Sequence, residues 1–156
     1  MAAIMNADYI NPFLVAATKV LRDMVCIDAQ IGKPYTKDTK FGEQSLLIML
    51  GVTGKMKGQV ILDFQNTVAL DVASKMCMMP LDEMNDLAQS AVCELGNMIL
   101  GNTATVFSTK GIGIDITPPT ICSGPVTFSS MYAANICIPL IYEEDKVIEI
   151  NVALSA

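Results

Sequence analysis

The apolar positions along this chain recur at helical spacing in three segments. Residues 12–24 form the first segment, and Asn11 before a proline is a typical helix start, with asparagine as the N-cap. A second helix is expected over residues 66–79, capped by one of its first two residues and ended by the proline that follows. Asp82 is expected to cap a long third helix over residues 83–102. The pattern therefore predicts three amphipathic helices.

Shorter apolar stretches between and after these segments predict β-strands. Residues 45–53 are a continuous apolar run, and residues 59–64 resume it after a turn rich in glycine and lysine, so we expect a β-hairpin. Further strands are expected at residues 111–117, 126–130, 133–142 and 147–154. The charged segment 143–146 is expected to form the last hairpin turn.

This order of elements predicts an α+β fold, in which helices pack on a mostly antiparallel sheet. A helix followed by strands over residues 11–64 recurs as a helix followed by strands over residues 83–154, which indicates a faint internal duplication of topology. No linker or low-complexity tract divides the chain, so residues 1–156 are expected to be a single domain.

Composition and charge narrow the possible functions. Apolar residues make up 52% of the chain, but no apolar run approaches the roughly 20 residues that span a bilayer, and the first residues lack the features of a signal peptide. The net charge is −6 and Arg22 is the only arginine, which argues against nucleic acid or an anionic membrane as a partner. We therefore expect a cytoplasmic protein whose acidic balance suits solubility or a partner with basic groups.

Cysteine and histidine usage excludes several kinds of active site. The chain has no histidine. Cys-His catalysis and Ser-His-Asp hydrolysis therefore lack a required residue, and tetrahedral zinc sites have almost no ligands. Its cysteines are widely spaced among apolar neighbours and form no C-x-x-C pair, so we expect buried, reduced thiols and a core that includes methionines. The five cysteines are Cys26, Cys77, Cys93, Cys122 and Cys137.

A polar stripe on the third predicted helix is the best candidate for chemistry. Glu94 and Asn97 lie three residues apart, and Ser90 precedes Glu94 by four, so all three share one helical face. The stripe is either a solvated face or a site that holds a cation or a water molecule. Asparagine and glycine are both poor residues for a helix interior, which favours function, and small residues at Gly96 and Gly101 would let another surface approach closely.

The spacing Ser90-x3-Glu94-x2-Asn97, followed by a proline some twenty residues later, resembles the signature of the CheC/CheX/FliY family of chemotaxis phosphatases. The resemblance covers essentially the whole chain. It extends to residues 10–13, 32–34 and the 51–64 hairpin. The distance to Pro118 or Pro119 is one or two residues shorter than in the family, so which proline matches stays open, and both also suit a strand-breaking turn.

The first predicted helix lacks the second motif that CheC-like members carry. Pro12, Ala16 and Lys19 stand at the matching positions, so the chain resembles the single-motif CheX branch. That resemblance implies a homodimer formed through sheet edges, and the apolar strands near the C-terminus would suit such pairing.

The resemblance also implies a reaction. The family hydrolyses the aspartyl phosphate of the response regulator CheY, with Asn97 orienting the attacking water and Glu94 pairing with a lysine of the partner. Mg²⁺ belongs to the phosphorylated CheY-like receiver domain, so this chain is expected to need no cofactor of its own, and Ser90 and Gly101 are expected at the partner interface. The alternative is a non-catalytic chemotaxis or flagellar-switch scaffold that binds a receiver domain without hydrolysis.

Overall fold

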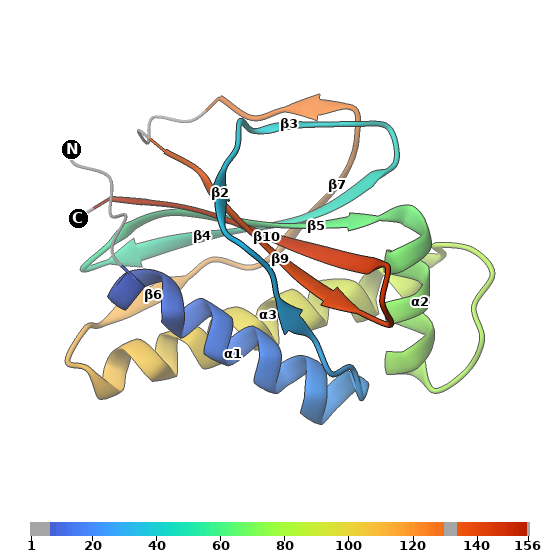
Figure 1. Cartoon of the computed structure of the whole chain (residues 1–156), viewed down its shortest axis with the longest axis horizontal. Coiled ribbons are helices and arrows are strands. Elements are labelled where there is room, and N and C mark those ends of the chain that lie inside the picture. The colour runs from blue at the N-terminus through green and yellow to red at the C-terminus, as the bar shows by residue number, and fades with distance from the viewer. Residues whose placement is uncertain (1–6, 130–133, 156) are drawn as a thin grey trace.

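The computed structural model describes residues 7–129 and 134–155, in which three helices lie on one face of a β-sheet (Figure 1). The helices are α1 (Ala7–Val25), α2 (Asn66–Cys77) and α3 (Asp86–Thr109). The strands are β1 (Gln30–Ile31), β2 (Tyr35–Thr36), β3 (Lys40–Phe41), β4 (Ser45–Gly54), β5 (Lys57–Gln65), β6 (Ile114–Ile116), β7 (Thr120–Ser123), β8 (Val126–Thr127), β9 (Ile136–Tyr142) and β10 (Lys146–Ser155). The predicted α+β class is confirmed. None of the helices in these two described ranges is long and apolar enough to cross a membrane.

The main sheet is built around two hairpins that meet at its centre. Its strand order is β1-β9-β10-β5-β4-β6, with β2 also paired to β9 and β7 to β4, and every pair among the described residues is antiparallel. The hairpins β4–β5 and β9–β10 join through β5 and β10, and each follows a long helix, α1 or α3. This repeated order matches the predicted duplication of topology. β3 and β8 form a separate two-stranded sheet on the face away from the helices (Figure 1).

The continuous apolar run of β4 is explained by burial on both faces of the sheet. Ile48 and Leu50 point to the helical side, where they join one large core with the helices. Leu47 points to the other side and packs with Ile61 of β5 and Phe41 of β3. Because successive side chains of a strand alternate between faces, both faces must be covered for such a run to be buried. The predicted hairpin is confirmed, and its turn is shorter than expected because the strands extend to Gly54 and Lys57.

The start of α1 differs from the prediction. The helix already includes Ala7, so Asn11 is not its N-cap and Pro12 lies inside it. A proline there removes a backbone hydrogen bond. Ile10 and Phe13 on either side are buried, and this packing outweighs the local preference for a helix start at Asn11.

The caps of the other two helices also differ from the prediction. Gln65 precedes α2 without a side-chain hydrogen bond, and α2 ends at Cys77 with Met78 in the left-handed region. Asn85, not Asp82, caps α3, because its side chain accepts a hydrogen bond from the backbone N–H of Ala88 at 2.9 Å. Several residues before α3 could serve as a cap, and only the three-dimensional hydrogen bond distinguishes them.

The C-terminal strand lies inside the sheet, not at its edge. β10 has β9 on one side and β5 on the other, so it has no free edge for pairing with a second chain, contrary to our expectation. The short strands β1, β2 and β7, which the sequence pattern missed, cover β9 and β4 instead. The homodimer itself stays a prediction. Positions 130 and 133 of the expected strands 126–130 and 133–142 lie outside the described residues.

A buried carboxyl group lies on the face of the sheet away from the helices. Asp63 is 5% exposed, its Oδ1 atom has no hydrogen-bond partner, and it stands directly opposite Glu149 on β10. Glu149 Oε2 accepts hydrogen bonds from Tyr35 and from Cys137, whose Sγ is 3.1 Å away. Burial raises the pKa of Asp63, and the nearby Glu149 adds to that effect, whereas a hydrogen bond from Ser45 opposes it. The folded state therefore favours a protonated Asp63.

We predict that Asp63→Asn stabilises the fold at neutral pH. A raised pKa means that the folded state binds the Asp63 proton more tightly than the unfolded state, so its stability falls as the pH rises above the ordinary aspartate pKa. The neutral amide avoids burying a charge, and we expect the free energy of unfolding at pH 7 to rise by about 1–3 kcal/mol. Urea unfolding between pH 3 and pH 8 measures this, with exposed Asp115→Asn as the control. An equal shift at all pH values would contradict the explanation.

Candidate functional site

The predicted polar residues form one exposed stripe on α3. The residues of α3 that face the core recur at helical spacing: Ala88, Val92, Leu95, Gly96, Ile99, Leu100, Thr103 and Phe107. On the opposite side, Ser90, Glu94 and Asn97 are exposed and Gly101 is half-buried. Steps of four, three and four residues place these side chains in a line along the helix axis. We call these four residues the α3 stripe.

Leu87 continues this line by one turn towards the N-terminus of α3. Its side chain is 51% exposed. Leu87 lies three residues before Ser90 and so shares the exposed face of α3, whereas its neighbour Ala88 is buried in the core. The stripe therefore starts with an exposed apolar residue.

Gly96 fixes how closely α3 approaches the sheet. A Cβ atom at this position would lie 2.9 Å from Ile48 Cγ2 and 3.5 Å from Leu50 Cδ1 and Leu62 Cδ1. Gly96 therefore allows close packing of α3 on the protein's own sheet. Our expectation that it lets the surface of another molecule approach is wrong. Gly101 is different, because nothing lies within 4 Å of a Cβ built there. Of the two glycines, only Gly101 leaves room on the exposed side.

The acid and the amide of the α3 stripe are not used by the fold. Within the described parts of the chain, the side chains of Glu94 and Asn97 form no hydrogen bond or ion pair. Asn102, by contrast, donates its Nδ2 hydrogen to the backbone carbonyl of Met98 at 2.8 Å. An exposed asparagine without such a bond does not stabilise a helix, since its side chain competes for the hydrogen bonds of the helical backbone. Both groups are thus free to bind something outside this chain.

The matching face of α1 carries no second acid-amide pair. α1 and α3 lie side by side (Figure 1), and Phe13 of α1 meets Phe107 of α3 edge to face at a ring distance of 5.7 Å. Pro12 and Ala16 are buried in this contact region. Lys19 is exposed, and its Nζ forms an ion pair with Asp23 at 2.5 Å. The structure therefore agrees with one polar stripe per chain.

The cysteines, acidic groups and prolines of the described residues supply no alternative site. All five cysteines are free thiols, but only Cys137 is buried and Cys26 is exposed, so the expectation of five buried thiols is wrong. Burial raises the pKa of Cys93 on α3, which keeps that thiol protonated and a poor nucleophile. Among the described residues, no group of three or more histidine, cysteine, aspartate or glutamate side chains could hold a metal ion. Pro118 and Pro119 separate β6 from β7, as expected of a strand-breaking turn.

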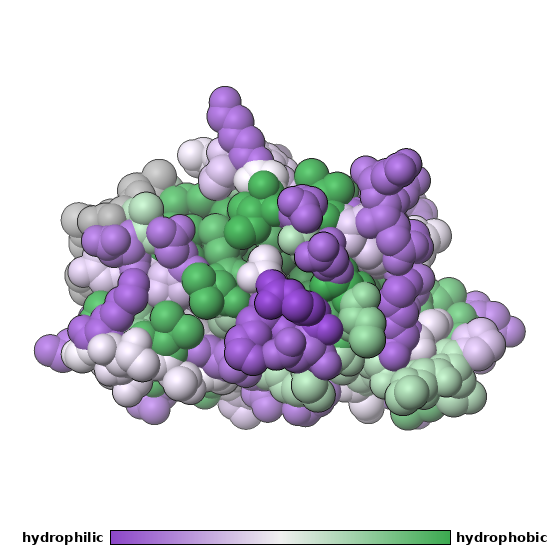
Figure 2. All heavy atoms as spheres, turned by 60° about the horizontal axis from the view of Figure 1, so that its bottom comes forward, coloured by the Kyte–Doolittle hydropathy of each residue, from purple (hydrophilic) through white to green (hydrophobic). Residues whose placement is uncertain are grey.

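The methionines are divided between the core and the surface, and Met76, Met84 and Met98 pack against the core as expected. Of those in the described ranges, only Met56 is fully buried, whereas Met78 is 92% exposed and Met79 is 50% exposed. Figure 2, which brings the helical side forward, shows a pale green patch at the lower right, where α2 and its connection to α3 lie. Methionine is therefore a surface residue of the helical layer as well as a core residue.

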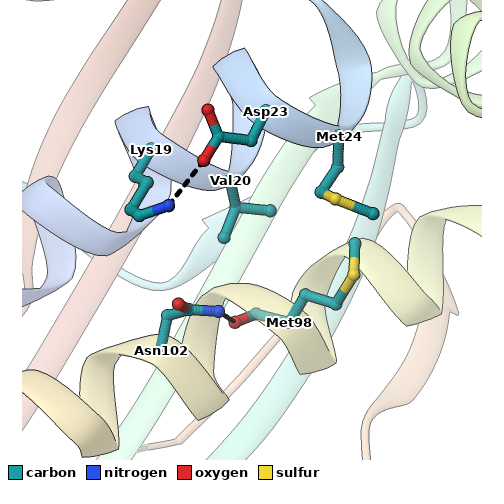
Figure 3. A pocket seen from close by; sticks show the side chains of 6 residues that line it. All are labelled: Lys19, Val20, Asp23, Met24, Met98 and Asn102. Carbon is teal, nitrogen blue, oxygen red and sulfur yellow. Dashed lines mark hydrogen bonds and ion pairs between the residues drawn. The ribbon is translucent and has the colours of Figure 1, made fainter.

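A hollow between α1 and α3 lies beside the stripe, and the sequence pattern did not reveal it. Its lining comes from Lys19, Val20, Asp23, Met24, Met98 and Asn102 (Figure 3). Four of these residues are more than seventy positions from the other two along the chain. Only the packing of the two helices brings them together. We call this feature the α1–α3 hollow.

We predict that Gly96→Leu and Gly101→Leu have opposite effects on stability. Leucine at position 96 must enter the packed contact with Ile48, so we expect the free energy of unfolding to fall by about 3 kcal/mol. Leucine at position 101 meets open space and improves helix propensity, so it should stabilise by up to about 1 kcal/mol. Urea unfolding of both variants tests this. Equal effects would show that α3 does not approach the sheet through Gly96.

Comparison with known proteins identifies the family of this chain. Residues 46–140 match the family described as chemotaxis phosphatase CheX. The chain is 36% identical over 121 residues to CheY-P phosphatase CheX of Thermotoga maritima, which covers 77% of this chain and 78% of that protein.

Solved structures resemble the chain over nearly its whole length. The CheX-CheY-BeF3-Mg²⁺ complex from Borrelia burgdorferi matches with a TM-score of 0.83 and 32% identity, over 97% of this chain and 100% of that chain. A CheC-like superfamily protein from Shewanella sp. PV-4 matches with a TM-score of 0.86 and 26% identity, over 97% of this chain and 100% of that chain. By its sequence and its fold, this chain belongs to the CheX family of chemotaxis phosphatases.

Proposed function

We propose that this chain hydrolyses the aspartyl phosphate of a CheY-like response regulator. The observation that carries the proposal is the pair Glu94 and Asn97, exposed on one line of a rigid helix and free of partners within the described part of the fold. A curated relative is named a CheY-P phosphatase, and a similar structure is a complex of CheX with CheY, BeF3 and Mg²⁺. These names support the same class of substrate for this chain.

In this proposal Asn97 positions the attacking water. Hydrolysis of an acyl phosphate forms a bond from the water oxygen to phosphorus and breaks the bond from phosphorus to the aspartyl oxygen, which leaves as a carboxylate. The transition state is loose, so the main task of the protein is to hold the water in line. A carboxamide can accept a hydrogen bond from the water through its oxygen, and it carries no charge that would repel the phosphate.

Glu94 is proposed to fix the helix in register on the receiver. It lies one turn before Asn97, so a cationic side chain of the partner that pairs with Glu94 would set the position of the amide along the helix axis. A lysine in the receiver is the expected partner of this carboxylate. The negative charge of the whole chain would also favour approach to a basic rim.

The rest of the active site is proposed to belong to the receiver. Mg²⁺ bound to the receiver would neutralise the charge of the phosphate, so this chain would need no metal of its own. Ser90 has no base beside it that could make it a nucleophile, so we assign Ser90 and the open surface at Gly101 to the contact with the receiver. A homodimer remains part of the proposal, and the five free thiols suit a reducing cytoplasm.

Asn97→Ala tests the role of the amide. We expect the rate of receiver dephosphorylation to fall by about 10²-fold or more, because the water is no longer held, while circular dichroism and thermal unfolding stay unchanged. The measurement is the loss of phosphate from a phosphorylated CheY-like receiver of the same organism. Exposed Asn66→Ala on α2 is the matched control and should behave like the parent protein.

Two outcomes would contradict this assignment. Full activity of the Asn97→Ala variant would remove Asn97 from the mechanism. Binding of the receiver without any acceleration by the parent protein would instead favour the non-catalytic scaffold.

Glu94→Gln tests the proposed ion pair with the receiver. The glutamine keeps the shape of the side chain but removes its charge, so we expect KM for the phosphorylated receiver to rise about tenfold at low salt. The difference from the parent protein should shrink in high salt, because salt screens the charge interaction. Glu43→Gln, an exposed change before β4, is the control. A KM that is unchanged at every salt concentration would exclude the pair.

A further inference from the structure

The α1–α3 hollow is a small depression lined by three apolar and three polar residues. Val20 and Met24 of α1 and Met98 of α3 contribute its apolar lining, and the two methionine side chains extend towards each other across it (Figure 3). Its volume is about 150 Å³. Sites for drug-sized ligands are at least about 300 Å³, whereas a cavity of about 150 Å³ accommodates a benzene-sized group. The hollow therefore fits one large side chain and not a nucleotide or a cofactor.

The polar residues at the rim are already paired. Lys19 Nζ and Asp23 Oδ2 form an ion pair at 2.5 Å on α1, so the rim presents no unpaired charge of either sign. The Asn102 amide is turned back to the Met98 carbonyl and does not fill the space. A lining of this kind selects an uncharged, apolar group, because a charged group would lose its hydration without gaining a partner.

Met24 has no clear use within the fold. Its side chain is 56% exposed, so it buries little apolar area against this chain's own core. Methionine is flexible and polarisable, and at a surface it adapts to the shape of an incoming apolar group. Together with Val20 and Met98, it gathers apolar surface in one hollow that an apolar group of another protein could contact.

The hollow continues directly from the α3 stripe. Met98 follows Asn97, and Asn102 follows Gly101, so the hollow and the stripe share the same turns of α3. Gly101 has no side chain to stand between them, and the space above it is open. A protein that covers Asn97 from the side of α1 would therefore lie close to the hollow.

We propose that the α1–α3 hollow receives one apolar side chain of the phosphorylated receiver while Asn97 enters the receiver's phosphate site. This inference rests on the proposed function. The receiver fits better than a second copy of this chain, because a copy seated in the hollow would also cover the stripe and block the substrate. Met24 and Met98 are thus positioning residues, which set affinity for the receiver and take no part in the reaction at phosphorus.

The test compares Met24→Ser with Val15→Ser. Both residues lie on α1 and are similarly exposed, at 56% and 54%, but Val15 does not line the hollow. We expect Met24→Ser to raise KM for the phosphorylated receiver about tenfold, with kcat unchanged, and Val15→Ser to change neither. The dissociation constant for the receiver carrying BeF3 and Mg²⁺ should rise by the same factor.

A spectroscopic measurement reports the contact directly. With methyl-labelled methionine, addition of the BeF3-loaded receiver should shift the NMR signals of Met24 and Met98. The signal of Met56, which is buried at the β4–β5 turn, should not move. A structural role of Met24 within this chain would not produce such a pattern.

The outcomes separate this inference from the proposed function. Hydrolysis by the parent protein together with an unchanged KM in Met24→Ser would overturn the inference and leave the function intact. Binding without hydrolysis would overturn the function, and the dissociation constants would still decide the role of the hollow. A changed oligomeric state in Met24→Ser with unchanged receiver binding would assign the hollow to a second copy and overturn the inference.

Discussion

The close contact of α3 with the sheet at Gly96 is the constraint on which the rest of the structure depends. A helix that rests on Ile48, Leu50 and Leu62 through a glycine has little freedom to rotate about its own axis, because any larger group would enter the packed core. With the rotation fixed, Glu94 and Asn97 must point away from the sheet. The same residue that weakens the helix locally therefore determines the direction of its polar stripe.

This arrangement explains how a chain without histidine can belong to a phosphatase family. A rigid helix presents one acid and one amide at fixed spacing, and neither is used for the stability of the fold. The phosphate, the leaving group and the metal would all come with the receiver. On the proposed function, the complete active site would form only where the two proteins meet. The apolar α1–α3 hollow beside the stripe adds affinity and orientation to that contact.

Local patterns in the sequence predicted what depends on local geometry. The hairpin β4–β5 was predictable because two short apolar runs flank a turn rich in glycine, which is typical of paired strands. The stripe followed from helical spacing. The start of α1 was not predictable, because tertiary packing decides it. The cap at Asn85 was not predictable either, because one hydrogen bond in the folded structure decides it. The role of Gly96 and the α1–α3 hollow also escaped, because they depend on segments that are distant in sequence. Family resemblance, not periodicity, assigned chemistry to the stripe.

On the proposed function, this chain supplies only half of an active site. The most direct measurement compares phosphate release from two acyl phosphates in the presence of Mg²⁺: a phosphorylated CheY-like receiver and free acetyl phosphate. We expect faster loss of phosphate from the receiver when the chain is added, and no acceleration for acetyl phosphate. Hydrolysis of acetyl phosphate by this chain alone would contradict it, because the chain would then hold a complete active site of its own.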